Sequence, residues 1–132
     1  MKKERNTKQR EAIREVFQHE DRPLDAQEIL TLAQAHCPGL GIATVYRALN
    51  KFVEEDFLVP VEIPGNPTRY EQAGKHHHHH FHCNQCQKTF EVDGCPGDLS
   101  SLTPKGFALE SHEIVLYGLC SGCNLSVHSA SV

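Results

Sequence analysis

Two cysteine pairs in the second half of the chain constrain its fold most strongly. They are Cys83-x-x-Cys86 and Cys120-x-x-Cys123, separated by the 33 residues 87–119. Four thiolates in two such pairs suit a closed tetrahedral Zn²⁺ site, which is structural rather than catalytic. Four reduced thiols without metal are less favoured, because unpaired cysteines seldom fall into this arrangement. The remaining Cys37 and Cys95 are expected to be ordinary thiols.

The composition indicates a small folded protein that stays in water. Of the 132 residues, 39% are hydrophobic and 23% are charged, too apolar for a disordered chain and too polar for a membrane protein. There is no apolar run near the roughly 18 residues of a membrane span, and Met1-Lys2-Lys3-Glu4 leads into no apolar signal core. We therefore expect a cytoplasmic protein with reduced thiols, in which paired cysteines bind metal.

The first half of the chain has the pattern of three helices. A helix is expected over residues 6–19, with Asn6 as its capping residue, and a second begins at Asp25, where Glu28 completes a capping box. The third is expected over residues 43–55, with an apolar stripe facing inward and a polar, aromatic and basic outer face. The inward residues are Val45, Ala48, Leu49 and Phe52, and the outer ones are Thr44, Tyr46, Arg47, Asn50 and Lys51.

A short hairpin is expected after the third helix. Strands at 58–63 and 68–71 flank the turn at 64–67. Three helices and a two-stranded wing make a winged helix-turn-helix domain, in which the third helix enters the DNA major groove. A small helical domain with a merely solvated third helix fits the same pattern. Net charge does not decide, because residues 1–60 carry nine basic and ten acidic side chains, although cations gather within residues 1–18.

The second half is expected to fold separately. We expect a first domain over residues 1–71, a hinge at 72–75 and a second domain over residues 76–132. A domain this small needs a metal, a partner subunit or both for stability. Its predicted elements are strands at 76–83, 89–92 and 108–119, with a short helical turn near 98–102.

A histidine run, His76–His80, precedes the first cysteine pair. Alternate side chains leave opposite faces of a strand, so His78 and His80 project one way and His77 and His79 the other. One strand can therefore serve two metal sites. A purification tag or a solvated polar tract would explain the run without metal, but metal ligands concentrate beside such thiolate pairs. Nearby side chains able to complete the sites are Glu71, Glu91, Asp98 and His112.

Three segments carry a specific combination of motifs. They are Gly41-Ile42-Ala43-Thr44-Val45-Tyr46-Arg47-Ala48-Leu49, the histidines ahead of Cys83-x-x-Cys86, and His112 followed by Leu116-Tyr117-Gly118-Leu119-Cys120-x-x-Cys123. From Arg5 to Cys123, the chain resembles the ferric uptake regulator family. The resemblance implies an α+β protein with an N-terminal winged helix-turn-helix domain and a small C-terminal α/β dimerisation domain holding structural zinc. It also implies a homodimeric, metal-activated transcriptional repressor that binds double-stranded operator DNA. Such a protein is not expected to be an enzyme, to associate with a membrane or to bind a small organic substrate.

The resemblance implies three metal sites and a DNA-reading surface. Structural Zn(II) falls on Cys83, Cys86, Cys120 and Cys123. The sensing site between the domains, for Zn(II) or Fe(II), falls on Glu71, His78, His80 and Glu91. An additional site falls on His77, His79 and His112, with Asp98 as its acidic ligand. The DNA contacts fall on Arg5, Arg10, Thr44, Tyr46 and Arg47.

The chain departs from the family pattern at one sensing-site position. Members usually supply a histidine two or three residues before the alanine that starts the second helix, and here Pro23 or Leu24 stands there. If neither His19 nor His36 replaces that histidine, Glu71 alone links the DNA-binding domain to the sensed metal.

The sensed metal is expected to be zinc, because the site is rich in imidazole and the affinity order places Zn²⁺ above Fe²⁺ and Mn²⁺. Iron-responsive and peroxide-responsive regulators of the same family are the alternatives. Zinc sensors often place a thiolate where Glu71 stands, and Glu91 differs from the aspartate of the peroxide branch.

A zinc buffer or metallochaperone would not explain the outer face of the third helix. A zinc hydrolase or deaminase needs an open metal position, and the H-x-E and P-C-x-x-C pattern is absent.

Overall fold

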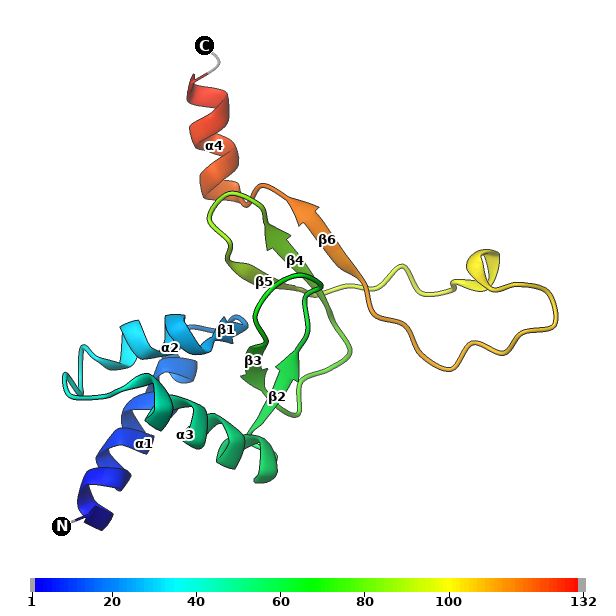
Figure 1. Ribbon diagram of the computed structural model, residues 1–132. Helices are drawn as coiled ribbons and strands as arrows, with labels where there is room; N and C mark the ends of the chain where they lie inside the picture. Colours follow the sequence, from blue (N-terminus) through cyan, green and yellow to red (C-terminus); the bar gives the residue numbers. More distant parts are fainter. Residues whose placement is uncertain (1, 131–132) are drawn as a thin grey trace. The chain divides into compact units, whose positions relative to one another are not determined.

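The computed structural model describes residues 2–130, with the side chains of residues 7–125 (Figure 1). The chain divides into two compact units, Met1–Gly74 and Lys75–Val132. The first contains α1 (Lys2–His19), β1 (Leu24–Asp25), α2 (Ala26–Ala33), α3 (Ile42–Glu54), β2 (Leu58–Val61) and β3 (Arg69–Gln72). The second contains β4 (His79–Cys83), β5 (Thr89–Val92), the 3-10 turn η1 (Ser100–Leu102), β6 (Val115–Gly118) and α4 (Ser121–Ala130). This content confirms the predicted α+β class.

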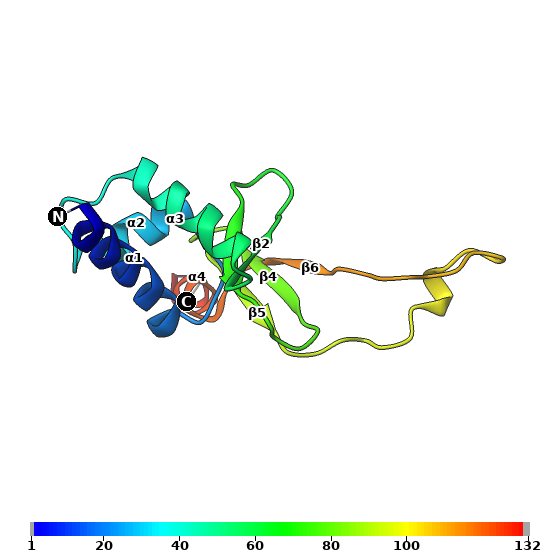
Figure 2. The same cartoon turned by 90° about the horizontal axis from the view of Figure 1, so that it is seen from below.

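The three helices of the first unit enclose its hydrophobic core (Figure 2). Arg14 of α1 also lies over the rings of Phe52 and Phe57, with its guanidinium carbon 5.1 and 4.8 Å from the ring centres. Burial of each large apolar side chain contributes about 1.5–3 kcal/mol to folding. The predicted inward face of α3 is confirmed, since Val45, Ala48, Leu49 and Phe52 are all buried. The core therefore fixes which side of α3 faces outward.

Local capping signals succeed at α2 and fail at α1. Asp25 Oδ1 accepts a hydrogen bond from the Glu28 amide at 2.8 Å, and Glu28 Oε1 accepts one from the Asp25 amide at 3.2 Å, which confirms the predicted capping box. Helix α1 instead begins at Lys2. The prediction that Asn6 caps it was wrong, because Lys2–Arg5 are good helix formers and nothing stops the helix there.

The wing has three strands rather than the predicted two. Strand β3 lies between β1 and β2 and is antiparallel to both. Strand β1 pairs Leu24 with Tyr70 and Asp25 with Arg69. A two-residue strand has no periodicity to detect, so the sequence could not reveal it. Pro60 lies in the edge strand β2, where the loss of one N–H donor is tolerated.

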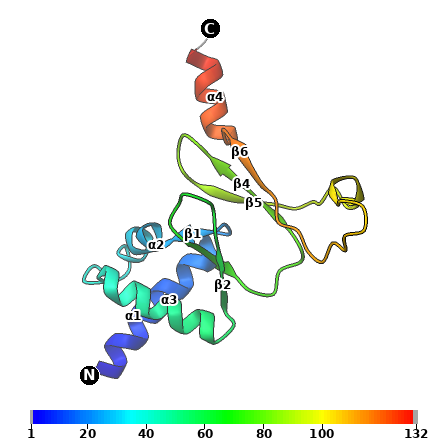
Figure 3. The same cartoon turned by 45° about the vertical axis from the view of Figure 1, so that its right-hand side comes forward.

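In the second unit, β4 is the central strand of a three-stranded sheet. It runs antiparallel to β5 and parallel to β6, and Figure 3 shows the three strands together, followed by α4. The predicted strand at 108–119 is only Val115–Gly118, and helix α4 was not expected. Residues 93–114 form the long connection between β5 and β6. Among the described residues, no helix is long and apolar enough to cross a membrane.

We predict that Asp25→Ala destabilises the first unit by about 1 kcal/mol, because α2 loses its capping hydrogen bond. The matched variant Asp25→Asn should remain near the wild-type stability, since asparagine caps equally well. Urea unfolding followed by circular dichroism measures the loss. Peptide-level hydrogen exchange should assign it to α2 and its neighbours. Equal stabilities of the two variants would contradict the assignment of a stabilising cap to this side chain.

Candidate metal centres and nucleic-acid interface

The first candidate metal centre is made by the ends of two parallel strands. Cys83 ends β4 and lies opposite Gly118 of β6 in register, so the chain that leaves β6 brings Cys120 beside Cys83. Gly118 leaves room for the Phe81 ring, because a Cβ atom at this position would lie 3.1 Å from that ring and would have to push it aside by a few tenths of an ångström. Cys123 follows in the first turn of α4. The two cysteine pairs therefore meet at one end of the sheet.

The geometry of these thiols fits a zinc ion. The ligand atoms of Cys83, Cys86, Cys120 and Cys123 all lie within 4.8 Å of one another. Sulfurs at the corners of a tetrahedron with Zn–S bonds of about 2.3 Å are about 3.8 Å apart. The Cys86 and Cys120 sulfurs are separated by 3.8 Å. The cluster is typical of a structural zinc site.

Backbone amides prepare Cys83 for ionisation. Burial raises its pKa, but the N–H groups of Cys120, Cys86 and Gln85 outweigh this effect and lower the pKa to about 6. The Sγ atom accepts from the Cys86 and Cys120 amides, both at 3.4 Å. Cys123 shows the opposite effect, because its side-chain hydrogen bond with Cys120 helps raise its pKa to about 12. Four thiolates this close repel one another, so a bound cation is needed for all four to ionise.

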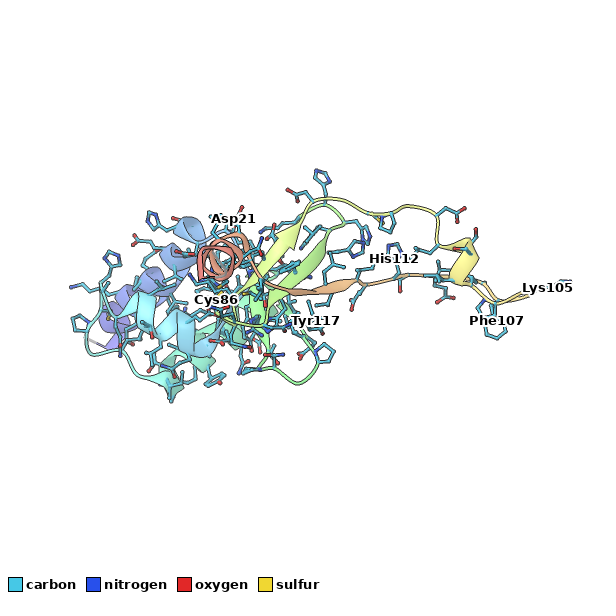
Figure 4. The ribbon with its side chains drawn as sticks, turned by 90° about the horizontal axis from the view of Figure 1, so that it is seen from above. Asp21, Cys86, Lys105, Phe107, His112 and Tyr117 are labelled. Carbon is cyan, nitrogen blue, oxygen red and sulfur yellow. The ribbon has the colours of Figure 1, made fainter. Side chains whose placement is uncertain are left out.

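The second candidate metal centre contains three imidazoles and a thiol. Its members are His77, His79, Cys95 and His112, whose ligand atoms also lie within 4.8 Å of one another. His112 Nε2 is 3.2 Å from His77 Nε2 and 3.1 Å from Cys95 Sγ. In Figure 4, His112 lies on the segment that leads into β6, between the loop tip marked by Lys105 and Phe107 and the strand itself. This cluster lies entirely within the second unit.

The fourth member of this cluster differs from the sequence interpretation. Asp98 was expected as its acidic ligand and Cys95 as an ordinary thiol. In the structure Cys95 takes that place, while the Asp98 carboxylate accepts from the Ser100 amide at 2.9 Å and from the Ser100 hydroxyl at 3.1 Å. The connection 93–114 has no periodic pattern, so nothing in the sequence showed which of its side chains turns toward β4.

His79 is the most buried imidazole of this centre, with 3% of its surface exposed. The Ile114 amide donates to its Nδ1 at 3.1 Å, and its buried Nε2 has no hydrogen-bond partner among the described residues. Burial and the neighbouring imidazoles, first His77 and then His112, lower the pKa of His79, which favours the neutral ring that metals bind. Because Nδ1 accepts this hydrogen bond, the neutral ring carries its proton on Nε2. A metal can bind Nε2 only if this proton is lost, or if it moves to Nδ1 and the hydrogen bond from Ile114 breaks.

The predicted sensing residues lie partly in each unit. In the second unit the His78 and His80 rings have centroids 4.9 Å apart, and His78 Nδ1 donates to the His76 carbonyl at 2.7 Å, leaving Nε2 as the ligand atom. His80 lies opposite Glu91 in register, and the Glu91 carboxylate forms an ion pair with Lys75. Glu71 lies on β3 of the first unit. The four-residue sensing site stays a prediction.

The residues at which the chain departs from the family pattern lie inside the first unit. Pro23 and Leu24 are buried, so they belong to the core of the first unit. His19, at the end of α1, and His36, after α2, are both exposed. Among the described residues neither His19 nor His36 belongs to a group of potential metal ligands.

The outer face of α3 is a candidate nucleic-acid interface. Tyr46 is 50% exposed, and Arg47 donates to the Thr44 hydroxyl at 3.0 Å. Arg10 of α1 and Lys51 line a surface depression together with Thr44 and Arg47. Such a surface offers cations for phosphates and a projecting aromatic and guanidinium for base edges. The side chain of Arg5 lies outside the described residues.

Comparison with known proteins identifies the family. The model of the ferric uptake regulator family matches residues 2–117. The chain belongs to this family. It is 31% identical over 117 residues to the ferric uptake regulation protein of Staphylococcus aureus, covering 89% of this chain and 86% of that protein.

Solved structures agree with this family membership. The ferric uptake regulator of Helicobacter pylori, described as having three functional metal binding sites, is 28% identical, with a TM-score of 0.66 over 89% of this chain and 80% of that one. A zinc uptake regulator complexed with zinc and DNA is 26% identical, with a TM-score of 0.56 over 92% of this chain and 83% of that one. The chain is thus similar to both an iron-named and a zinc-named regulator.

We predict that the purified protein holds one tightly bound zinc per chain in the four-thiolate centre. Cys83→Ala or Cys120→Ala should lose this zinc and destabilise the second unit, because that small unit depends on the metal. Cys37→Ala is the matched control and should retain it. Elemental analysis after extensive dialysis against a weak chelator measures the stoichiometry. Retention of the metal by both cluster variants would contradict the assignment.

Proposed function

We propose that this family member is a metal-responsive repressor that binds double-stranded operator DNA and controls genes of metal-ion homeostasis, with Zn(II) as co-repressor. The observation that carries the proposal is the exposed face of α3, where Thr44, Tyr46 and Arg47 project from a helix fixed by its buried side. A metal store or an enzyme has no need of such a face. We further propose that the protein is cytoplasmic and has no catalytic activity.

The proposed switch depends on the segment that joins the two units. Gly74 has a φ of 82°, a conformation that glycine adopts readily, so it suits a hinge. A metal bound by Glu71 together with the second-unit ligands His78, His80 and Glu91 would restrict movement at this hinge. If only the restricted arrangement places two recognition helices about 34 Å apart, metal and DNA binding become coupled. A 10- to 100-fold coupling corresponds to about 1.4–2.7 kcal/mol.

The Lys75–Glu91 ion pair belongs to this switch. Lys75 follows Gly74 directly, and its ammonium group contacts the carboxylate proposed as a metal ligand. A metal ion that binds the same carboxylate oxygen, Oε1, would therefore have to displace Lys75. Two states of Glu91 would therefore alternate. Lys75 neutralises the carboxylate when the metal is absent, and the metal neutralises it when bound.

The second unit supports the proposal of a homodimer. Large apolar side chains on β6 and on the 93–114 connection are exposed, including Leu102, Phe107, Leu109 and Leu116. A unit this small cannot cover such a surface from its own chain, and exposed apolar patches of this kind mark interfaces. We propose a second copy of the chain as the partner, because paired recognition helices require one.

We predict that DNA binding is switched on by metal, most effectively by Zn²⁺, in protein whose four-thiolate centre is already loaded. The measurement is operator binding by fluorescence anisotropy, with Zn²⁺, Fe²⁺ and Mn²⁺ buffered separately at fixed free concentrations. Glu91→Ala should weaken the metal-dependent increase at least about 10-fold, since it removes a ligand. Glu110→Ala, an exposed carboxylate on the long connection, is the matched control. Binding that is indifferent to all three metals would refute the proposed switch.

We predict that Arg47→Ala lowers affinity for the specific operator by about 1–3 kcal/mol and relaxes its sequence preference, because a base contact is lost. Arg10→Ala should weaken binding to all sequences and reduce the salt slope by about 1. Lys105→Ala, at the tip of the long connection, removes a cation outside this surface and should change neither quantity. Competition assays over a salt series separate these effects. An unchanged operator preference in Arg47→Ala would remove α3 as the reading helix.

A further inference from the structure

We propose that Cys95 is a metal ligand and that the centre formed with His77, His79 and His112 selects tetrahedral, thiolate-binding cations such as Zn²⁺ over Fe²⁺ and Mn²⁺. The inference refines the additional site of the proposed function, where the family resemblance had placed a carboxylate. It concerns metal coordination alone and does not require that the protein bind DNA.

The distances within the centre match four-coordinate zinc. Bonds of about 2.0 Å to nitrogen and 2.3 Å to sulfur place tetrahedral corners about 3.3–3.6 Å apart. The His77–His112 nitrogen separation is 3.2 Å, and the His112 nitrogen to Cys95 sulfur separation is 3.1 Å. All four ligand atoms lie within 4.8 Å of one another. Small outward shifts therefore complete a tetrahedron without rearrangement of the strands.

Two further observations point to a ligand at this place. The buried Nε2 atom of His79 has no hydrogen-bond partner among the described residues, and a metal would bind it once the ring proton has moved to Nδ1 and the Ile114 contact has opened. The Gly97 amide donates to Cys95 Sγ at 3.4 Å, the same kind of bond that Cys83 Sγ accepts in the first centre. Gly97 has a φ of 82°, which turns the backbone so that its N–H faces the sulfur. The Cys95 sulfur therefore has a hydrogen-bond donor of its own.

The ligand set determines which metals the centre prefers. Carboxylates suit Fe²⁺ and Mn²⁺ as well as Zn²⁺, whereas a thiolate among imidazoles favours zinc. The one nearby carboxylate proposed from the sequence, Asp98, is held by two hydrogen bonds from Ser100. Four protein ligands also close the coordination sphere, which favours a structural or regulatory site over a catalytic one.

Metal binding here would also fasten the long connection. Cys95 lies near the start of the 93–114 connection and His112 near its end. His79 is the first residue of β4, and His77 lies two residues before it. One ion would therefore hold both ends of an otherwise irregular segment against the sheet. We expect the amides near these two ends to exchange more slowly when metal is bound.

The test uses Co²⁺ as a spectroscopic substitute for Zn²⁺ in full-length protein that keeps zinc in its four-thiolate centre. Titration should produce a near-ultraviolet sulfur-to-cobalt charge-transfer band of single-thiolate intensity, with the visible absorption of tetrahedral Co²⁺. The predicted sensing site has no thiolate and cannot give this band. Zinc measured after each titration verifies that Co²⁺ has not entered the four-thiolate centre.

Cys95→Ser should abolish the charge-transfer band and weaken Zn²⁺ binding at this centre at least about 10-fold. Cys37→Ser, the matched control, should leave both unchanged. Cys95→Asp should remove the band but retain a site whose preference for Zn²⁺ over Mn²⁺ is reduced. Circular dichroism and retained structural zinc verify that each variant folds. Absence of the band in the wild type, or its persistence in Cys95→Ser, would overturn the proposal.

The outcomes separate this inference from the proposed function. A cobalt band that depends on Cys95 supports the inference even if operator binding ignores every metal. Metal-switched operator binding without such a band would leave the repressor proposal intact and refute the role of Cys95.

Discussion

The parallel pairing of β4 with β6 is the constraint on which the second unit depends. Register places Cys83 opposite Gly118 and His80 opposite Val115. One end of the strand pair therefore gathers the four thiols, and the other end gathers the histidines with His112. The side chains of both candidate centres are distant in sequence, and without the pairing they would not come together in space.

The two candidate centres of the second unit differ in how firmly the protein prepares them. Two backbone N–H groups, those of Cys86 and Cys120, donate to Cys83 Sγ at 3.4 Å in the absence of metal. In the histidine-rich centre, Cys95 and His112 come from a connection with little regular structure. Closing that centre must order more chain, which costs conformational entropy. We therefore expect it to bind metal less tightly than the four-thiolate centre and to respond to changing metal supply.

Sequence reasoning succeeded where the signal is local or periodic. The stripe on α3 and the capping box at Asp25 each depend on residues within a few positions of one another, and the structure confirms both. The paired cysteines predicted the group of four thiols that the structure brings together, because C-x-x-C spacing is itself a local constraint. Strand β1 depends on pairing with β3, and the place of Cys95 depends on the path of a long connection. Neither leaves a pattern in neighbouring residues. The Asn6 cap failed because good helix formers extend α1 past it.

The composition of the wing bears on how copies of the chain associate. Its sheet has two edges, the two-residue β1 and the four-residue β2 that contains Pro60. A short strand offers few backbone groups to an incoming chain, and proline removes a donor from the other edge. The first unit is thus protected against strand addition, the route by which exposed sheets polymerise. Self-association is left to the apolar surface of the second unit, so assembly can stop at a closed pair rather than continue into a fibre.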